Sequence, residues 1–165
     1  MSSVVVVVPS PRFPVSTWTP QIQGALSVAK VRAVEKVRVL GDNVPGTATW
    51  VANPVRSKSG VAFEAVVTDW ADATPAKTRN EALLAGAATV VVLGHVMTSS
   101  AKHALGRVFG SPRFTVVQVI DGEAKLVGRE TIQCAPGYEI PAQKVATPTE
   151  EDGWSSFAPK AKAKK

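Results

Sequence analysis

The chain has 165 residues, of which 45% are hydrophobic and 19% charged, a composition that excludes a disordered chain and suits one globular domain. Its single cysteine, Cys134, excludes an intrachain disulfide and a cysteine-based metal cluster. No apolar run approaches the roughly 18 residues that a membrane span needs, and the valine run at 4–8 is too short for a signal-peptide core. We therefore expect a soluble protein, intracellular or part of a virion, that contacts no membrane and is not secreted through a signal peptide.

The positive charge is concentrated at the C-terminus. Residues 159–165 contain four of the 19 Lys and Arg residues and none of the 13 Asp and Glu residues, so the rest of the chain carries only +2 of the total +6. A cationic tail binds phosphate groups without needing a particular fold. We therefore expect four tail lysines to contact nucleic acid or another polyanion: Lys160, Lys162, Lys164 and Lys165.

The composition divides the chain into three segments. Residues 1–14 are expected to form an N-terminal strand or arm, 15–134 an α+β core domain, and 135–165 a largely unfolded tail that is proline-rich and acidic first and lysine-rich at its end. The valines at 4–8 are open to two interpretations. They form a short strand of the domain's own sheet, or an extended arm whose uncharged edge pairs with a neighbouring subunit.

The first half of the core is expected to contain one helix and three strands. Apolar residues recur at helical spacing over 16–34, and alternation over 36–40 predicts a strand. Two further strands are predicted over 47–55, around Trp50, and over 61–70. A polar loop separates them, which favours an antiparallel hairpin.

The second half of the core begins with the best local signal in the chain. Thr74 is placed as an N-cap, with Pro75 at the first helical position, where the missing amide hydrogen costs nothing. The apolar face of this helix is expected to continue to Val92, and Gly94 to end the helix.

A second helix and a hairpin follow. A second helix is predicted over 101–109, capped by Ser99 or Ser100 and ended by Gly110. Strands over 114–120 and 124–132 are joined by Asp121-Gly122, which is a strong two-residue hairpin signal. Together these elements predict an antiparallel sheet with two or three helices on one face, and a ferredoxin-like topology.

No metal or cofactor site is expected. The only histidines, His95 and His103, need not share a helix face, and zinc requires more ligands than Cys134 adds. Glycines are scattered without a phosphate-binding motif. Ser99-Ser-Ala-Lys102 matches the S-x-x-K pattern of acyl-serine enzymes, but Ser27-Val-Ala-Lys30 matches it too, and helix capping explains Ser99 better.

Three carboxylates support one catalytic alternative. Asp69 and Asp121 end predicted strands, and Glu81 lies early on the helix between them. Thr78-Arg-Asn-Glu81, followed by an Ala/Leu-rich helix, resembles the ribonuclease H fold. That resemblance implies a nuclease that binds two magnesium ions through such carboxylates.

Four cations of the core are candidates for phosphate contacts. Arg56 and Lys58 lie in the predicted hairpin loop, and Lys77 and Arg79 lie on the first turn of the following helix, whose free amides add to an anion site. The strand over 59–65 resembles the core strand of RNA-recognition motifs. The order of hairpin and basic helix resembles double-stranded-RNA-binding domains, which likewise implies RNA as a partner.

These observations favour a non-enzymatic protein that assembles with itself and contacts nucleic acid, most concretely a viral or phage coat-like protein. Terminal arms gain stability when a neighbouring subunit orders them. The alternatives are a small RNA- or DNA-binding module, such as a regulator or silencing factor, and the metal-dependent nuclease of ribonuclease H type.

Overall fold

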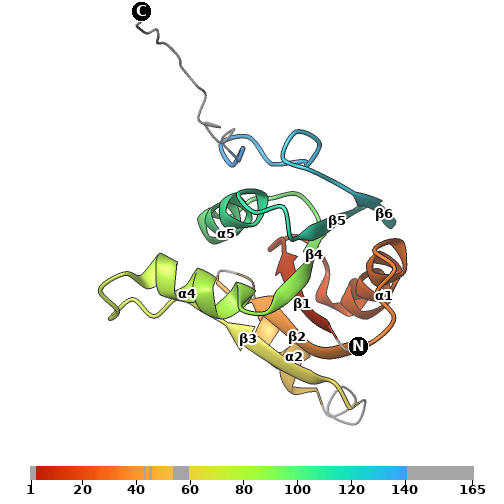
Figure 1. Cartoon of the computed structure of the whole chain (residues 1–165), viewed down its shortest axis with the longest axis horizontal. Helices are drawn as coiled ribbons and strands as arrows, with labels where there is room; N and C mark the ends of the chain where they lie inside the picture. Colours follow the sequence, from red (N-terminus) through yellow and green to blue (C-terminus); the bar gives the residue numbers. More distant parts are fainter. Residues whose placement is uncertain (1–2, 43, 45, 54–59, 141–165) are drawn as a thin grey trace, which may run out of the picture.

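The computed structural model describes residues 3–42, 44, 46–53 and 60–140 and shows one six-stranded sheet between helices (Figure 1). In chain order the elements are β1 (Ser3–Pro9), a 3-10 turn η1 (Val15–Thr17), α1 (Trp18–Val28), β2 (Val34–Leu40), α2 (Thr47–Ala52), β3 (Ala62–Val66), α4 (Pro75–Leu84), β4 (Ala87–Leu93), α5 (Ser99–Phe109), β5 (Thr115–Ile120) and β6 (Glu123–Leu126). The expected combination of helices with one sheet is confirmed.

The sheet is mostly parallel, which corrects the antiparallel, ferredoxin-like expectation. Its strand order is β3-β2-β1-β4-β5-β6, and every neighbouring pair is parallel except β5 and β6. The valine run lies in β1, at the centre of the sheet, with Val5–Val8 at most 2% exposed. A strand buried on both faces is continuously apolar, as this one is. The strand interpretation of residues 4–8 is therefore confirmed, and the arm interpretation is wrong.

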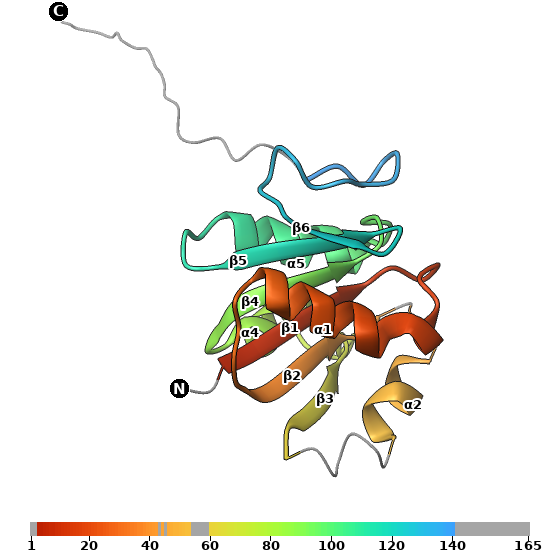
Figure 2. The same cartoon turned by 90° about the vertical axis from the view of Figure 1, so that its right-hand side faces the viewer.

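Helices cover both faces of the sheet, not one face as expected (Figures 1 and 2). Alternate side chains of a strand point to opposite faces. Val6 and Val8 of β1 pack in the cluster that includes α4 and α5, whereas Val5 and Val7 pack in the cluster that includes α1 and α2. This is a doubly wound arrangement, in which α1 and α2 cover one face of a mostly parallel sheet and α4 and α5 cover the other.

Three local predictions of secondary structure are wrong. Residues 47–52, expected to be a strand, form α2, which places Trp50 edge-to-face with Trp18 and Phe63 (centroids 5.4 and 5.5 Å apart). The helix expected to reach Val92 ends at Leu84, because Gly86 adopts φ +72° and the apolar residues that follow form β4. The antiparallel hairpin expected between residues 47–55 and 61–70 is absent as well, because the first segment forms α2 and β3 runs parallel to β2.

Other local predictions hold. β2 and the start of α4 at Thr74-Pro75 form as expected, and α1 forms but ends at Val28 and not at residue 34. The β5–β6 hairpin also forms, with φ +54° at Asp121 and +80° at Gly122, but β6 ends at Leu126 and not at residue 132. α5 also forms, but its N-cap is Thr98, whose side chain accepts a hydrogen bond from the Ala101 amide at 3.1 Å.

The described part of the chain ends against the body of the protein. Val96 forms an isolated bridge with Cys134, and the side chain of Ile140 is 9% exposed. The acidic and lysine-rich parts of the predicted tail lie outside the described residues.

Among the residues that the structure describes, no helix is long and apolar enough to cross a membrane.

Candidate functional site

The strand order creates a crevice at the carboxyl edge of the sheet, between β1 and β4. The chain leaves β1 toward α1 on one face, and leaves β4 toward α5 on the opposite face. The two connections diverge, so neither covers the space between the strand ends. In doubly wound sheets ligands bind at this point. Figure 2 shows the segment after β1 beside the β5–β6 turn at the right-hand edge of the sheet.

A cleft of about 460 Å³ occupies this position. Its walls come from the segment after β1, the first turns of α1, the segment after β4 and the β5–β6 turn. The lining residues that matter below are Ser10, Arg12, Phe13, Gln21, His95, Met97, Ile120 and Asp121.

The backbone of the cleft is tightly packed where the two diverging segments meet. The Ser10 amide donates to the Leu93 carbonyl at 2.8 Å, and the Gly94 amide donates to the Val119 carbonyl at 2.9 Å. Gly94 has φ +83°, and a Cβ there would lie 3.0 Å from the Ser10 Cβ and 3.2 Å from Phe13. Glycine is therefore required at position 94, for both its backbone conformation and its small size.

We expect Gly94→Ala to destabilise the protein by about 2–3 kcal/mol, because left-handed strain adds to a steric clash. Gly86→Ala is the matched control, since Gly86 also has a positive φ but a Cβ at that position would have no neighbouring atom within 4 Å. Its expected cost is about 1–2 kcal/mol, from backbone strain alone. Urea unfolding of both variants measures the difference, and equal costs would contradict the close packing at Gly94.

Three polar side chains around the cleft are free to bind a ligand. Arg12, His95 and Asp121 are exposed, and within the described part of the chain their side chains form no hydrogen bond or ion pair. The main chain offers little to an anion here. Pro9, Pro11 and Pro14 have no amide hydrogen, and the amides of Arg12 and Phe13 are bonded to Ser10. The segment after β1 must therefore contact a ligand through its side chains.

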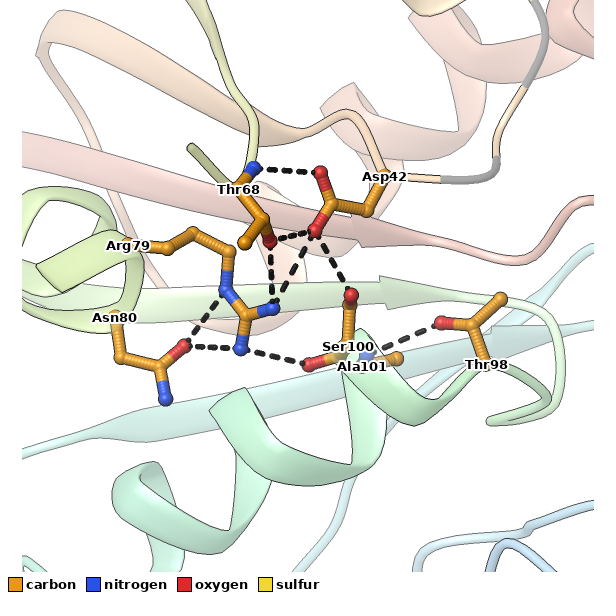
Figure 3. A network of polar contacts seen from close by, with 7 residues as sticks. All are labelled: Asp42, Thr68, Arg79, Asn80, Thr98, Ser100 and Ala101. Carbon is orange, nitrogen blue, oxygen red and sulfur yellow. Dashed lines mark hydrogen bonds and ion pairs between the residues drawn. The ribbon is translucent and has the colours of Figure 1, made fainter. Parts of the chain in front are cut away.

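A second polar cluster at the same edge of the sheet is fully engaged (Figure 3). Asp42, which follows β2, accepts hydrogen bonds from the Thr68 amide (2.8 Å), the Thr68 hydroxyl and the Ser100 hydroxyl (2.8 Å). It also pairs with Arg79 at 3.3 Å. The Arg79 side chain is 3% exposed, and its guanidinium donates to the Asn80 side chain at 2.6 Å as well.

The charge of Asp42 is stabilised by these partners. Burial alone would raise the pKa of Asp42, but the hydrogen bonds from Thr68 and Ser100 and the positive charge of Arg79 outweigh it, so the pKa lies below its ordinary value. The cluster joins the ends of β2 and β3 to α4 and α5. Because its groups already satisfy one another, we assign it a structural role.

Two other clefts are of similar size, about 470 and 540 Å³. In the first, between α4 and α5, the Arg113 guanidinium donates to the Leu84 carbonyl and lies 4.4 Å from the centre of the Phe114 ring. In the second, beside β5 and β6, the Gln118 side chain donates to the carbonyls of Gly94 and Gln133. The Arg113 and Gln118 side chains therefore serve the fold, and the choice of the cleft between β1 and β4 depends on its position where the strand order reverses.

Of the predicted phosphate-binding residues, the structure places two. Lys77 is exposed on the first turn of α4, whereas Arg79 is buried in the Asp42 cluster and is not available to a phosphate. The other predicted cations lie outside the described residues: Arg56, Lys58, Lys160, Lys162, Lys164 and Lys165.

Residues 30–38 contain four Lys and Arg residues, and two of these form ion pairs within the protein. Lys36 and Arg38 both pair with Glu64 across the neighbouring strand, at 3.5 and 3.0 Å. The Arg38 guanidinium also donates to the carbonyls of Leu83 and Ala85 at the end of α4. A cation at a helix C-terminus stabilises the helix, so this arginine has a structural role.

The carboxylates of the nuclease alternative are not brought together. Asp69 lies in the loop after β3, Glu81 on α4 and Asp121 in the β5–β6 turn. Among the described residues, no group of three or more His, Cys, Asp or Glu side chains could hold a metal ion. His95, His103 and Cys134, the other possible metal ligands, likewise belong to no such group among the described residues.

Sequence reasoning missed Arg12 and Asp42. Asp42 lies two residues after the end of β2, and a carboxylate at a strand end could have marked it. Arg12 has no local signal, because its importance depends on which strands lie side by side. Comparisons with protein-family models, curated proteins and solved structures found no match for this chain. The functional argument therefore depends on the geometry of the site.

Proposed function

We propose that this chain is a binding domain for a small polar molecule, held in the cleft between the ends of β1 and β4. One contrast carries the proposal. Asp42 and Arg79, at the same edge of the sheet, are completely engaged by the protein, whereas Arg12, His95 and Asp121 surround an open cleft unengaged within the described chain.

The size and lining of the cleft support this proposal. About 460 Å³ falls within the roughly 300–1,000 Å³ range of small-molecule sites. Phe13, Met97 and Ile120 supply apolar wall, and a few polar groups supply orientation. Such a mixture is typical of small-molecule sites.

We propose binding and not a reaction. Ser10, His95 and Asp121 are the residue types of a hydrolytic triad, but within the described chain no hydrogen bond joins them. Ser10 is 5% exposed, and its hydroxyl accepts a hydrogen bond from the Arg12 amide at 3.3 Å. A nucleophile would need an adjacent base.

Self-assembly and nucleic-acid binding stay predictions. The assembly argument depended on a free valine arm, and those valines are the central strand of the sheet. The nucleic-acid argument loses Arg79 but retains Arg56, Lys58, Lys77 and the tail lysines, and a steep loss of affinity with added salt would support it.

The chain carries its own reporters for a binding experiment. It has two methionines, Met1 and Met97, and two histidines, His95 and His103, and one of each lines the cleft. We expect a library of small polar metabolites, added to protein with ¹³C-methyl methionine and ¹⁵N-histidine, to shift the NMR signals of Met97 and His95. The signals of Met1 and His103 should stay unchanged.

A blocked cleft provides the matched control. Gln21→Trp places a large ring at the cleft wall and should abolish the shifts, whereas Ser27→Trp, on an exposed position of α1 that does not line the cleft, should preserve them. A library that moves neither reporter, or binding that survives Gln21→Trp, would contradict the proposed function.

A further inference from the structure

We propose that the ligand of this cleft is a zwitterion of the amino-acid class, whose carboxylate binds Arg12 and whose ammonium group binds Asp121. This inference rests on the proposed function and names the ligand class of the same site.

Opposite charges share this cleft without neutralising each other. Arg12 and Asp121 both line it, yet among the described residues neither forms an ion pair within 4.0 Å. Elsewhere in the same structure neighbouring opposite charges do pair, as Arg79 does with Asp42 at 3.3 Å and Arg38 with Glu64 at 3.0 Å. A molecule with one charge of each sign complements both free groups at once.

The sheet holds the two charges apart. Arg12 follows β1 and Asp121 follows β5, and β4 lies between these strands. Two strand spacings separate the strand ends by about 10 Å. The Arg12 backbone is fixed by its amide's hydrogen bond to the Ser10 hydroxyl, and Asp121 is fixed in the two-residue turn that joins β5 to β6. A small ligand lying between the two side chains can meet both groups at once.

The remaining lining fits the body of an amino acid. Phe13, Met97 and Ile120 offer an apolar surface to its side chain, and Gln21 and His95 offer hydrogen bonds. Phosphorylated ligands fit poorly, because the prolines of the segment after β1 leave no cradle of amides, and Asp121 repels a second negative charge.

The test compares each amino acid with two derivatives that each lack one charge. The twenty common amino acids are titrated while the Met97 and His95 signals are followed, and the tightest binder is then compared with its N-acetyl derivative and its carboxamide. We expect each derivative to bind about tenfold or more weakly, because each loses a hydrogen-bonded charge pair.

Two variants assign each charge to its partner. Arg12→Gln should remove the preference for the free carboxylate over the carboxamide, and Asp121→Asn should remove the preference for the free ammonium over the acetylated amine. Asparagine tolerates the positive φ of position 121. Arg32→Gln and Asp69→Asn, exposed positions that do not line the cleft, should change neither preference.

The outcomes separate the two proposals. Equal binding of an amino acid and its derivatives, or Met97 shifts with other metabolites but with no amino acid, would overturn the zwitterion inference and leave the proposed function standing. If no small molecule moves Met97 or His95, both proposals fail.

Discussion

Asp42→Ala should destabilise the protein by about 3 kcal/mol, because breaking a buried ion pair by removing one partner leaves the other charge uncompensated. The substitution leaves the Arg79 guanidinium inside the protein, where its side chain is 3% exposed. It also removes the acceptor for the amide and hydroxyl of Thr68 and for the hydroxyl of Ser100. The cost stays near the low end of the range for buried pairs, because the Asn80 side chain still accepts from Arg79.

Glu64→Ala is the matched control, because it also removes a carboxylate that pairs with an arginine. The Glu64 side chain is 47% exposed, and exposed pairs contribute about 0–1 kcal/mol. Chemical unfolding of both variants measures the free energies. Equal losses of unfolding free energy in Asp42→Ala and Glu64→Ala would show that the contribution of Asp42 to stability does not depend on its burial.

The same cluster predicts how stability depends on pH. The pKa of Asp42 is lower in the folded protein than its ordinary value of 3.8, so the stabilisation from its ionised form is complete above that value. It is lost as the pH falls through the lower, folded value. Below about pH 4 the wild-type protein should therefore lose stability more steeply than Asp42→Asn, and parallel pH curves would contradict this.

Trp18→Ala should cost about 3–5 kcal/mol, the range for removing a large aromatic side chain from a core. Among the residues that the structure describes, Trp18 is the largest fully buried side chain, with 0% exposure, and it joins α1 to the face of β1 that carries Val5 and Val7. Its indole also lies edge-to-face with Trp50, and its Nε1 donates to the Phe13 carbonyl at 3.3 Å. A substantial part of the stability of a small domain depends on this one ring.

Trp70→Ala is the control for Trp18→Ala, because the Trp70 side chain is 79% exposed and its loss should change stability by no more than about 0.5 kcal/mol. Urea unfolding followed by circular dichroism measures both variants without depending on tryptophan fluorescence. A large effect at Trp70 would mean that this side chain has a buried contact in solution.

Local elements could be read from the sequence where a short stretch fixes its own backbone. Thr74-Pro75 starts α4, and Asp121-Gly122 forms the β5–β6 turn, because these residues favour the required φ values by themselves. The apolar runs at 4–8 and 87–93 were harder to assign. Periodicity alone does not distinguish a fully buried strand from a short arm or from a continuing helix.

The sequence by itself determined the start of α4, the existence of α5 and the final hairpin, since these depend on neighbours within a few residues. Only the tertiary structure decided that β1 lies between β2 and β4, that the sheet is mostly parallel, and that Arg79 is buried while Arg12 is free. The physical reason is that strand order, and the choice of partner for each charge, depend on contacts between residues far apart in the chain. The cleft exists because two distant segments, after β1 and after β4, diverge at the same edge of the sheet.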